Sequence, residues 1–210
     1  MSNNSKTLPL ENLPVNATVF AQTGDRSVQV AQANNVNNVV NLIIPMMSSG
    51  FGGFVNTNVA LNMDYYNLFV IGDETFCDGH FTIPKDRALT ESMSLETKVQ
   101  FSALSEEAVS QIKTFPSLFA SENHSYGKTD DAHQAYFGLV TNVKIQDNGI
   151  KIHFRPLWSV PQQRLNEIAS KIALQSAPAL NELNRTHWAI KKVNLIEELK
   201  AAGISVLAPT

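Results

Sequence analysis

A polar loop in the second half of the chain carries residue types suited to proton transfer or metal binding. The loop is SENHSYGKTDDAHQ, residues 121–134. The candidate catalytic residues, which include one histidine further along the chain, are Glu122, His124, Asp130, His133 and His187. Carboxylates and imidazoles can donate or accept protons and can bind divalent cations. The spacing of these residues, however, matches neither the H-E-x-x-H motif nor a nuclease-type strand pair. We therefore predict no metal and no cofactor. The stretch is either a solvated loop or a functional loop on a rigid scaffold.

Two arginine–tryptophan pairs are the candidates for ligand binding. They are Arg155 with Trp158 and Arg185 with Trp188. An aromatic ring beside an arginine can stack on a base, a sugar or a peptide. The alternative is that Trp188 belongs to the core and that Arg185 pairs with Glu182. The residue types alone leave both interpretations open.

Composition limits the class of protein and its partners. With 210 residues, 43% of them hydrophobic and 17% charged, the chain suits one domain with at most a smaller additional module. A net charge of −3 without a Lys/Arg cluster disfavours nucleic acid as a partner. The single cysteine, Cys77, excludes an intrachain disulfide and fits a reducing compartment. No apolar run approaches the ~20 residues of a spanning helix and no leader pattern is present, so we expect no membrane and a cytoplasmic location.

Local patterns in residues 63–210 predict the elements that must position these side chains. Strands are predicted at 65–71, 76–83, 93–101, 136–145, 150–154 and 187–193, where apolar residues alternate or run together. Helices are predicted from the N-cap residues Ser105, Ser159 and Asn194, ending near Lys113, Leu174 and Gly203. Asn148-Gly149 predicts a tight turn between two of the strands. Because hairpins dominate, we predict an α+β fold with an antiparallel sheet or a partly open β-barrel and about three helices.

The N-terminal part has a different composition. Residues 1–14 are polar and predict a flexible arm, and residues 15–45 hold short strand-like pieces. Five of the eight residues from Asn34 to Asn41 are asparagine, and amides in register can form hydrogen-bonded ladders between copies of a strand. Residues 46–62, rich in Gly, Ser and Asn, predict a linker before an α+β domain at 63–210.

Within this β-rich segment, Val28-Gln29-Val30-Ala31 with Asn34 resembles the RIP homotypic interaction motif and related bacterial amyloid-signalling segments. The family pattern has glycine where this chain has Ala31, and glycine permits the tight arc between stacked strands. The resemblance implies homotypic strand stacking, recruitment of a protein partner with a similar segment, and a setting in bacterial defence signalling. The self-association residues would be Val28, Gln29, Val30, Asn34, Asn35 and Asn38.

These observations favour a non-enzymatic, homo-oligomeric interaction or adaptor protein that self-associates through its Asn-rich β segment. The alternative is a metal-dependent hydrolase or nuclease, or a nucleic-acid-binding module, in residues 63–210. That alternative requires the five candidate catalytic residues to converge on one cleft. A third possibility is that residues 15–45 pair into the same sheet as the rest, because asparagine also favours ordinary turns.

Overall fold

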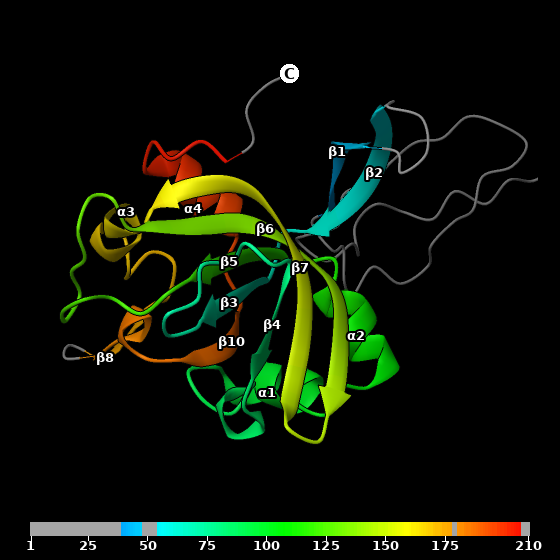
Figure 1. The fold of residues 1–210 in the computed structure, drawn as a ribbon, viewed down its shortest axis with the longest axis horizontal. Coiled ribbons are helices and arrows are strands. Elements are labelled where there is room, and N and C mark those ends of the chain that lie inside the picture. The colour runs from blue at the N-terminus through cyan, green and yellow to red at the C-terminus, as the bar shows by residue number, and fades with distance from the viewer. Residues whose placement is uncertain (1–38, 48–53, 178–179, 207–210) are drawn as a thin grey trace, which may run out of the picture. The chain divides into compact units, whose positions relative to one another are not determined.

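The computed structural model describes residues 39–47, 54–177 and 180–206 (Figure 1). All of these residues belong to the second of two units into which the chain divides, residues 37–210. The self-association residues predicted from the sequence, Val28 to Asn38, lie outside the described residues. Among the described residues, no helix combines the length and the apolar character needed to cross a membrane.

A six-stranded mixed sheet forms the centre of the fold and confirms the α+β class. In spatial order its strands are β10 (His187–Lys191), β3 (Tyr66–Val70), β5 (Pro116–Ala120), β6 (Gln134–Gln146), β7 (Gly149–Pro161) and β4 (His80–Ile83). The pair β3–β5 is parallel and the other four pairs are antiparallel. The sheet does not close into a barrel, since β10 and β4 are its two edges.

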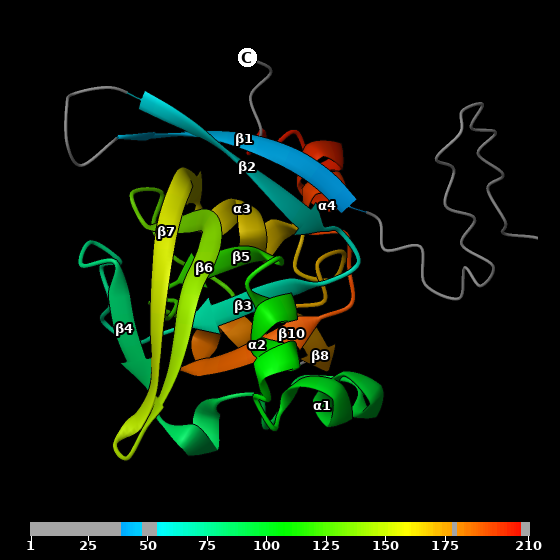
Figure 2. The same cartoon turned by 90° about the vertical axis from the view of Figure 1, so that its right-hand side faces the viewer.

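Helices cover both faces of this sheet (Figure 2). The helices are α1 (Leu95–Phe101), α2 (Glu106–Ile112), α3 (Gln162–Glu167) and α4 (Leu195–Ala201), with 3-10 turns η2 (Lys85–Arg87) and η3 (Glu182–Asn184). Alternate residues of β3 face opposite cores: Leu68 lies with α3 and α4, and Phe69 with α1 and α2. Burial on both faces explains why β3, β5 and β10 are buried at every position. A short pair, β8 (Gln175–Ala177) and β9 (Leu180–Asn181), completes the fold.

The prediction of a strand at 93–101 is wrong, because this segment forms α1. Ser94 is the N-cap residue, and its hydroxyl accepts a hydrogen bond from the Thr97 amide at 3.1 Å. The helix buries Thr97 and Phe101, four residues apart, and leaves Leu95 and Val99 78% and 75% exposed. The alternating pattern therefore included two apolar residues that contribute nothing to the core.

The helices predicted from Ser105 and Asn194 are confirmed. The Ser105 hydroxyl accepts from the Ala108 amide at 3.2 Å, and the Asn194 side chain accepts from the Glu197 amide at 3.2 Å. Gly203 follows α4 with φ +73°, the left-handed conformation that glycine adopts without strain. Side-chain caps are local signals, which is why the sequence located these two helix starts.

The long β6–β7 hairpin is confirmed, but its second strand is longer than predicted. Gly149 pairs with Gln146, so the connecting residues are 147 and 148, and the turn lies one residue before the predicted Asn148-Gly149. Ser159 pairs with Tyr136 in the ladder and does not cap a helix. The ladder holds the backbone extended as far as Pro161, and α3 then has only six residues. The prediction of a helix from Ser159 to Leu174 is therefore wrong at both ends.

A separate two-stranded hairpin precedes the six-stranded sheet. It consists of β1 (Val39–Met47) and β2 (Phe54–Asn62), paired antiparallel along nine residues. The prediction of a linker at 46–62 is wrong for residues 54–62, which form β2. The glycine-rich composition of this stretch masked a strand whose register is set by pairing with β1. The predicted boundary between a β-rich segment and the main domain falls inside this hairpin.

Candidate functional site

The carboxyl ends of the parallel strands β3 and β5 lie at one edge of the sheet. The loop after β5, residues 121–133, starts there, and residues 181–187 lead into β10 at the same edge because β10 is antiparallel to β3. We call these two segments the polar rim. In open sheets with parallel strands, ligand sites gather at the carboxyl ends of those strands. The rim is therefore the first place to look for chemistry.

Glu122 fastens the two segments of the rim to each other. Its Oε1 accepts hydrogen bonds from the backbone amide and the hydroxyl of Thr186, both at 2.6 Å. The Thr186 hydroxyl oxygen in turn accepts from the Gly72 amide, at the end of β3, at 2.8 Å. This carboxylate therefore holds three chain segments together, which is a structural role.

Five amide side chains add a hydrogen-bond network to these contacts. They are Asn123, Gln162, Asn166, Asn181 and Asn184. Asn123 is at the centre: its Nδ2 donates to Asn166 Oδ1 at 3.0 Å, and its Oδ1 accepts from Gln162 Nε2 at 2.9 Å. Asn181 donates to the same Asn166 oxygen at 2.8 Å. The network joins the loop after β5 to α3 and η3.

Amides also bind the loop backbone. Gln162 Nε2 donates to the Ser121 carbonyl at 2.9 Å, and the Gln162 amide donates to the His133 carbonyl at 2.9 Å. Asn184 accepts from the Gly127 amide and donates to the Ser125 carbonyl, both at 2.9 Å. The Ser121 end and the middle of the loop are thus held by side chains outside it, and the His133 end is held by the backbone N–H of Gln162. The loop is a positioned element of the fold.

Three of the candidate catalytic residues meet in this loop. His124 Nδ1 lies 2.8 Å from Asp130 Oδ2, and the rings of His124 and His133 are 4.6 Å apart at their centroids. One ligand atom from each of His124, Asp130 and His133 lies within 4.8 Å of the others, which makes them the described residues suited to share a metal. His133 Nε2 is 2.7 Å from the Ser121 hydroxyl. Partial burial and the neighbouring His124 lower the pKa of His133, and Asp130 opposes this shift.

The other candidates lie elsewhere. His187 contacts Glu182, and Glu122 binds Thr186, so the five predicted catalytic residues form three groups instead of one cleft. The convergence that the enzyme alternative requires is not found among them.

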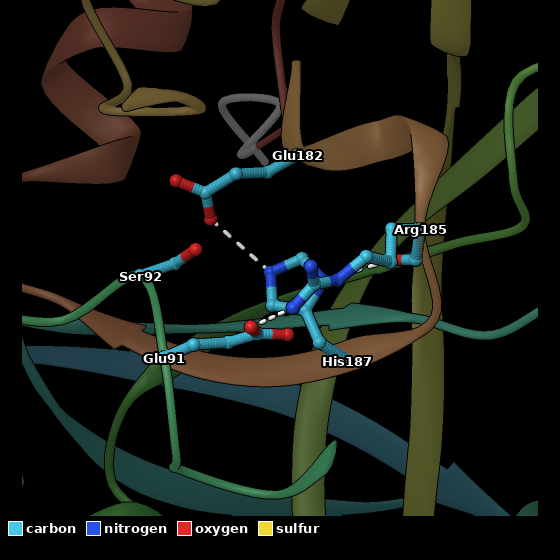
Figure 3. A pocket seen from close by; sticks show the side chains of 5 residues that line it. All are labelled: Glu91, Ser92, Glu182, Arg185 and His187. Atoms are coloured by element: carbon cyan, nitrogen blue, oxygen red, sulfur yellow. Dashed lines mark hydrogen bonds and ion pairs between the residues drawn. The ribbon is translucent and has the colours of Figure 1, made fainter. Parts of the chain in front are cut away.

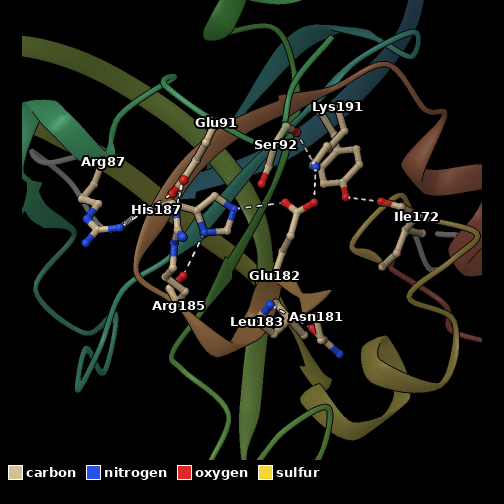
Figure 4. A network of polar contacts seen from close by, with 11 residues as sticks. Arg87, Glu91, Ser92, Ile172, Asn181, Glu182, Leu183, Arg185, His187 and Lys191 are labelled. Carbon is tan, nitrogen blue, oxygen red and sulfur yellow. Dashed lines mark hydrogen bonds and ion pairs between the residues drawn. The ribbon is translucent and has the colours of Figure 1, made fainter. Parts of the chain in front are cut away.

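Glu182 is the centre of a buried charged network (Figure 4). Its carboxylate is 3.1 Å from His187 Nε2 and accepts a hydrogen bond from Lys191 Nζ at 2.7 Å. Lys191 Nζ also donates to the Ser92 carbonyl at 2.6 Å. Burial lowers the pKa of Lys191, and Glu182 opposes that shift. Burial also raises the pKa of Tyr66, whose hydroxyl donates to the Ile172 carbonyl at 2.5 Å.

The hydrogen-bond partners of His187 indicate where the protons of its ring lie. His187 Nδ1 lies 2.8 Å from the Arg185 carbonyl, which can only accept, so Nδ1 carries a hydrogen. His187 Nε2 faces the Glu182 carboxylate, and one proton must lie between these two groups. Both ring nitrogens are therefore engaged within the protein. The arrangement stabilises the start of β10 and leaves the ring no nitrogen for a substrate.

A small pocket opens beside this network (Figure 3). It is lined by Glu91, Ser92, Glu182, Arg185 and His187. Arg185 forms an ion pair with Glu91, and Glu91 also lies 3.8 Å from Arg87. The sequence also allowed an ion pair between Arg185 and Glu182, but the partner of Arg185 is Glu91. Arg185, which lines the pocket, is therefore paired with Glu91.

The two predicted ligand-binding pairs differ in how deeply their tryptophans are buried. Trp188 is fully buried and stacks on Phe69 with ring centroids 5.1 Å apart, so it belongs to the core. Trp158 is half-buried against Phe137, and Arg155 lies in β7 opposite Leu139. Stacking of a ligand between Arg185 and Trp188 is thus prevented by the burial of Trp188.

Sequence patterns did not point to Glu182, Lys191 or the amide network. The spacing Glu182-x4-His187-x3-Lys191 is a usable signal afterwards, since it places ionisable residues in and beside the apolar strand β10. Comparison of the chain with protein-family models, with curated proteins and with solved structures finds no match. Function must therefore be argued from these residues.

Proposed function

We propose that this chain is a non-enzymatic interaction protein that assembles with copies of itself through its amide-rich β region. The observation that carries the proposal is the outer edge of β2. A strand edge with unpaired backbone groups is a template for another strand. Within the described ranges, β1 and β2 pair with each other and with no further strand.

One hydrogen bond fixes which backbone groups of β2 point outward. The Asn62 amide donates to the Thr114 carbonyl at 3.0 Å, away from its ladder partner Val39. Outward-pointing residues alternate along an antiparallel strand. The amides of Asn56, Asn58 and Ala60 therefore also point away from β1, where an added strand could accept from them.

The two edges of the hairpin differ in their capacity to pair. Pro45 is the ladder partner of Asn56, so it occupies an outward-pointing position of β1. Proline has no N–H, and natural sheets use it to block an edge. β2 contains no proline. The edge of β2 is consequently the one available for assembly.

Residue types along the hairpin support stacking of identical chains. Leu61 is fully buried against Leu139, whereas its neighbour Ala60 is exposed. The sequence places asparagine at 41, 56 and 58, in the same set of alternate ladder positions as Ala60. When identical strands stack in register, amides at equal positions can form ladders. A partner with a similar β segment would add in the same way, and the motif at Val28 to Asn34 would supply a second contact.

Light scattering on the full chain tests this proposal. We expect the wild type to have a mass that is a multiple of 23.1 kDa. Asn58→Pro removes one outward N–H without removing a hydrogen bond of the β1–β2 ladder, and should give monomers. Asn58→Ala keeps that N–H and removes only one of the three side-chain amides, so as the matched control it should still assemble.

A second set of variants distinguishes assembly through the hairpin from assembly through the motif segment. Val28→Asp with Val30→Asp places charges in the motif while leaving β2 unchanged. Loss of assembly in this variant and not in Asn58→Pro would move the contact to the motif. A monomeric wild type at all accessible concentrations would overturn self-association itself.

A further inference from the structure

We propose that His124, Asp130 and His133 bind a divalent transition metal of the zinc class at the polar rim. This site lies within one chain and is independent of assembly through β2. It uses three residues of one loop, and no fourth side chain is required. The remaining coordination position would hold water, as in zinc sites with three protein ligands.

The donor set selects the metal. Two imidazole nitrogens and one carboxylate oxygen suit zinc and its neighbours better than magnesium or calcium, which prefer oxygen alone. The three donor atoms lie within 4.8 Å of one another. Zinc–ligand bonds of about 2.0–2.1 Å place tetrahedral donors roughly 3.4 Å apart. His124 and Asp130 are exposed, so their side chains can make the shift of up to about 1.4 Å that this requires.

Contacts outside the metal position orient two of the three ligands. His133 Nε2 is engaged with the Ser121 hydroxyl, which leaves Nδ1 as the ligand atom. Asp130 Oδ1 accepts from the Ala132 amide at 3.0 Å, which leaves Oδ2 facing His124. Metal-binding histidines and carboxylates are generally held by such contacts on their second polar atom. The metal would displace the proton between His124 Nδ1 and Asp130 Oδ2.

The amide network supplies the third argument. At the two ends of the loop, Gln162 donates to the Ser121 carbonyl through its side chain and to the His133 carbonyl through its backbone N–H. Asn184 holds the middle of the loop at Gly127. The conformational entropy of bringing the ligands together is therefore lost on folding and not on metal binding, which increases affinity.

Another histidine pair in the described sheet provides the control. His80 and His153 face each other across β4 and β7 with ring centroids 5.7 Å apart. The charges of Lys144 and Lys151 act on His153 and would repel a cation. His80 is exposed like His124, so His80→Gln removes a comparable histidine from a place where we expect no tight binding.

Calorimetric titration of the full chain with zinc chloride near neutral pH tests the site. The experiment uses a Cys77→Ser background, because Cys77 is an exposed free thiol that could bind zinc. We expect one zinc per chain, and an affinity reduced at least about ten-fold in His124→Gln, His133→Gln and Asp130→Asn. Ser121→Ala, which removes the orienting contact of His133, should reduce affinity by about ten-fold. His80→Gln should bind like its parent.

Cobalt gives a second readout that does not depend on heat. Cobalt bound by these ligands should show the intense visible absorption of a tetrahedral site, and this absorption should disappear in His124→Gln. Circular dichroism checks that each variant is folded. Unchanged zinc affinity in the three ligand variants, or equal loss in His80→Gln, would overturn the proposal, as would the absence of binding to the parent.

Discussion

The β1–β2 hairpin and the polar rim are both rich in amide side chains, but they use their hydrogen-bonding capacity differently. In the rim, Asn123, Gln162 and Asn166 bond one another and the loop backbone. In β2, the outward backbone N–H groups of Asn56 and Asn58 have no partner strand within the described ranges. An amide-rich composition therefore does not itself indicate assembly. What matters is whether the polar groups are satisfied inside the chain.

The energetic consequence differs between the two regions. Removing one partner from the part-buried network of the rim leaves other polar groups unsatisfied, which costs up to about 1–3 kcal/mol for each such group. An exposed strand edge is solvated by water and costs the monomer little, but it remains open to pairing. We therefore expect substitutions that remove a partner in the rim to change stability, and substitutions that remove an outward N–H of β2 to change assembly.

Glu182→Ala should have the largest effect. It leaves Lys191 and His187 at a buried position without their shared carboxylate. Breaking a buried ion pair in this way costs about 3–5 kcal/mol. Urea unfolding at neutral pH measures the loss of unfolding free energy.

Glu96→Ala is the matched control for this substitution. Glu96 also faces a lysine, Lys192, at 3.7 Å, but its side chain is 72% exposed. Exposed pairs contribute at most about 1 kcal/mol. Equal losses in the two variants would show that Glu182 is not a structural centre of the rim.

Asn123→Ala should have an intermediate effect of about 1–3 kcal/mol, because it removes the side chain that joins Asn166, Asn184 and Gln162. Asn58→Ala, the same substitution in the hairpin, should change the unfolding free energy by less than about 0.5 kcal/mol. A loss in Asn58→Ala as large as that in Asn123→Ala would mean that the hairpin amides are also paired internally. The contrast between the two regions would then be wrong.

Features that depend on neighbouring residues could be predicted from the sequence, whereas features that depend on distant strand pairing could not. The caps at Ser105 and Asn194 and the turn before Gly149 depend on neighbouring residues, and they were predictable. Alternation at 93–101 was misleading, because over two turns the i, i+4 residues Thr97 and Phe101 also fit a period of two. The sequence did not indicate β2, because its glycine-rich surroundings also fit a linker and its register depends on pairing with β1.

The residues of the candidate site also fall into those that the sequence could indicate and those that it could not. His124, Asp130 and His133 could be named from the sequence because they share one loop. Glu182 and Lys191 could not, because their burial depends on the pairing of β10 with β3 and on the position of η3. The meeting of the rim segments depends on the parallel pair β3–β5, which no hairpin signal predicts.

The smallest effect concerns pH and separates the two regions in one titration. Burial and His124 hold the pKa of His133 below its ordinary value of 6.5, so the unfolded chain takes up a proton first as pH falls. This contribution to stability is complete above pH 6.5 and is lost as pH decreases toward the lowered pKa of His133. His133→Gln, studied with a chelator present, should therefore flatten the dependence of unfolding free energy on pH below 6.5.

The hairpin should not share this dependence. The sequence from Val39 to Met63 contains no Asp, Glu, His, Lys or Arg, so the edge of β2 has no group that titrates in this range. Assembly measured by light scattering over the same pH values should therefore be equal in the wild type and in His133→Gln wherever both are folded. A pH-dependent mass that His133→Gln abolishes would show that the rim, and not β2, forms the contact between copies.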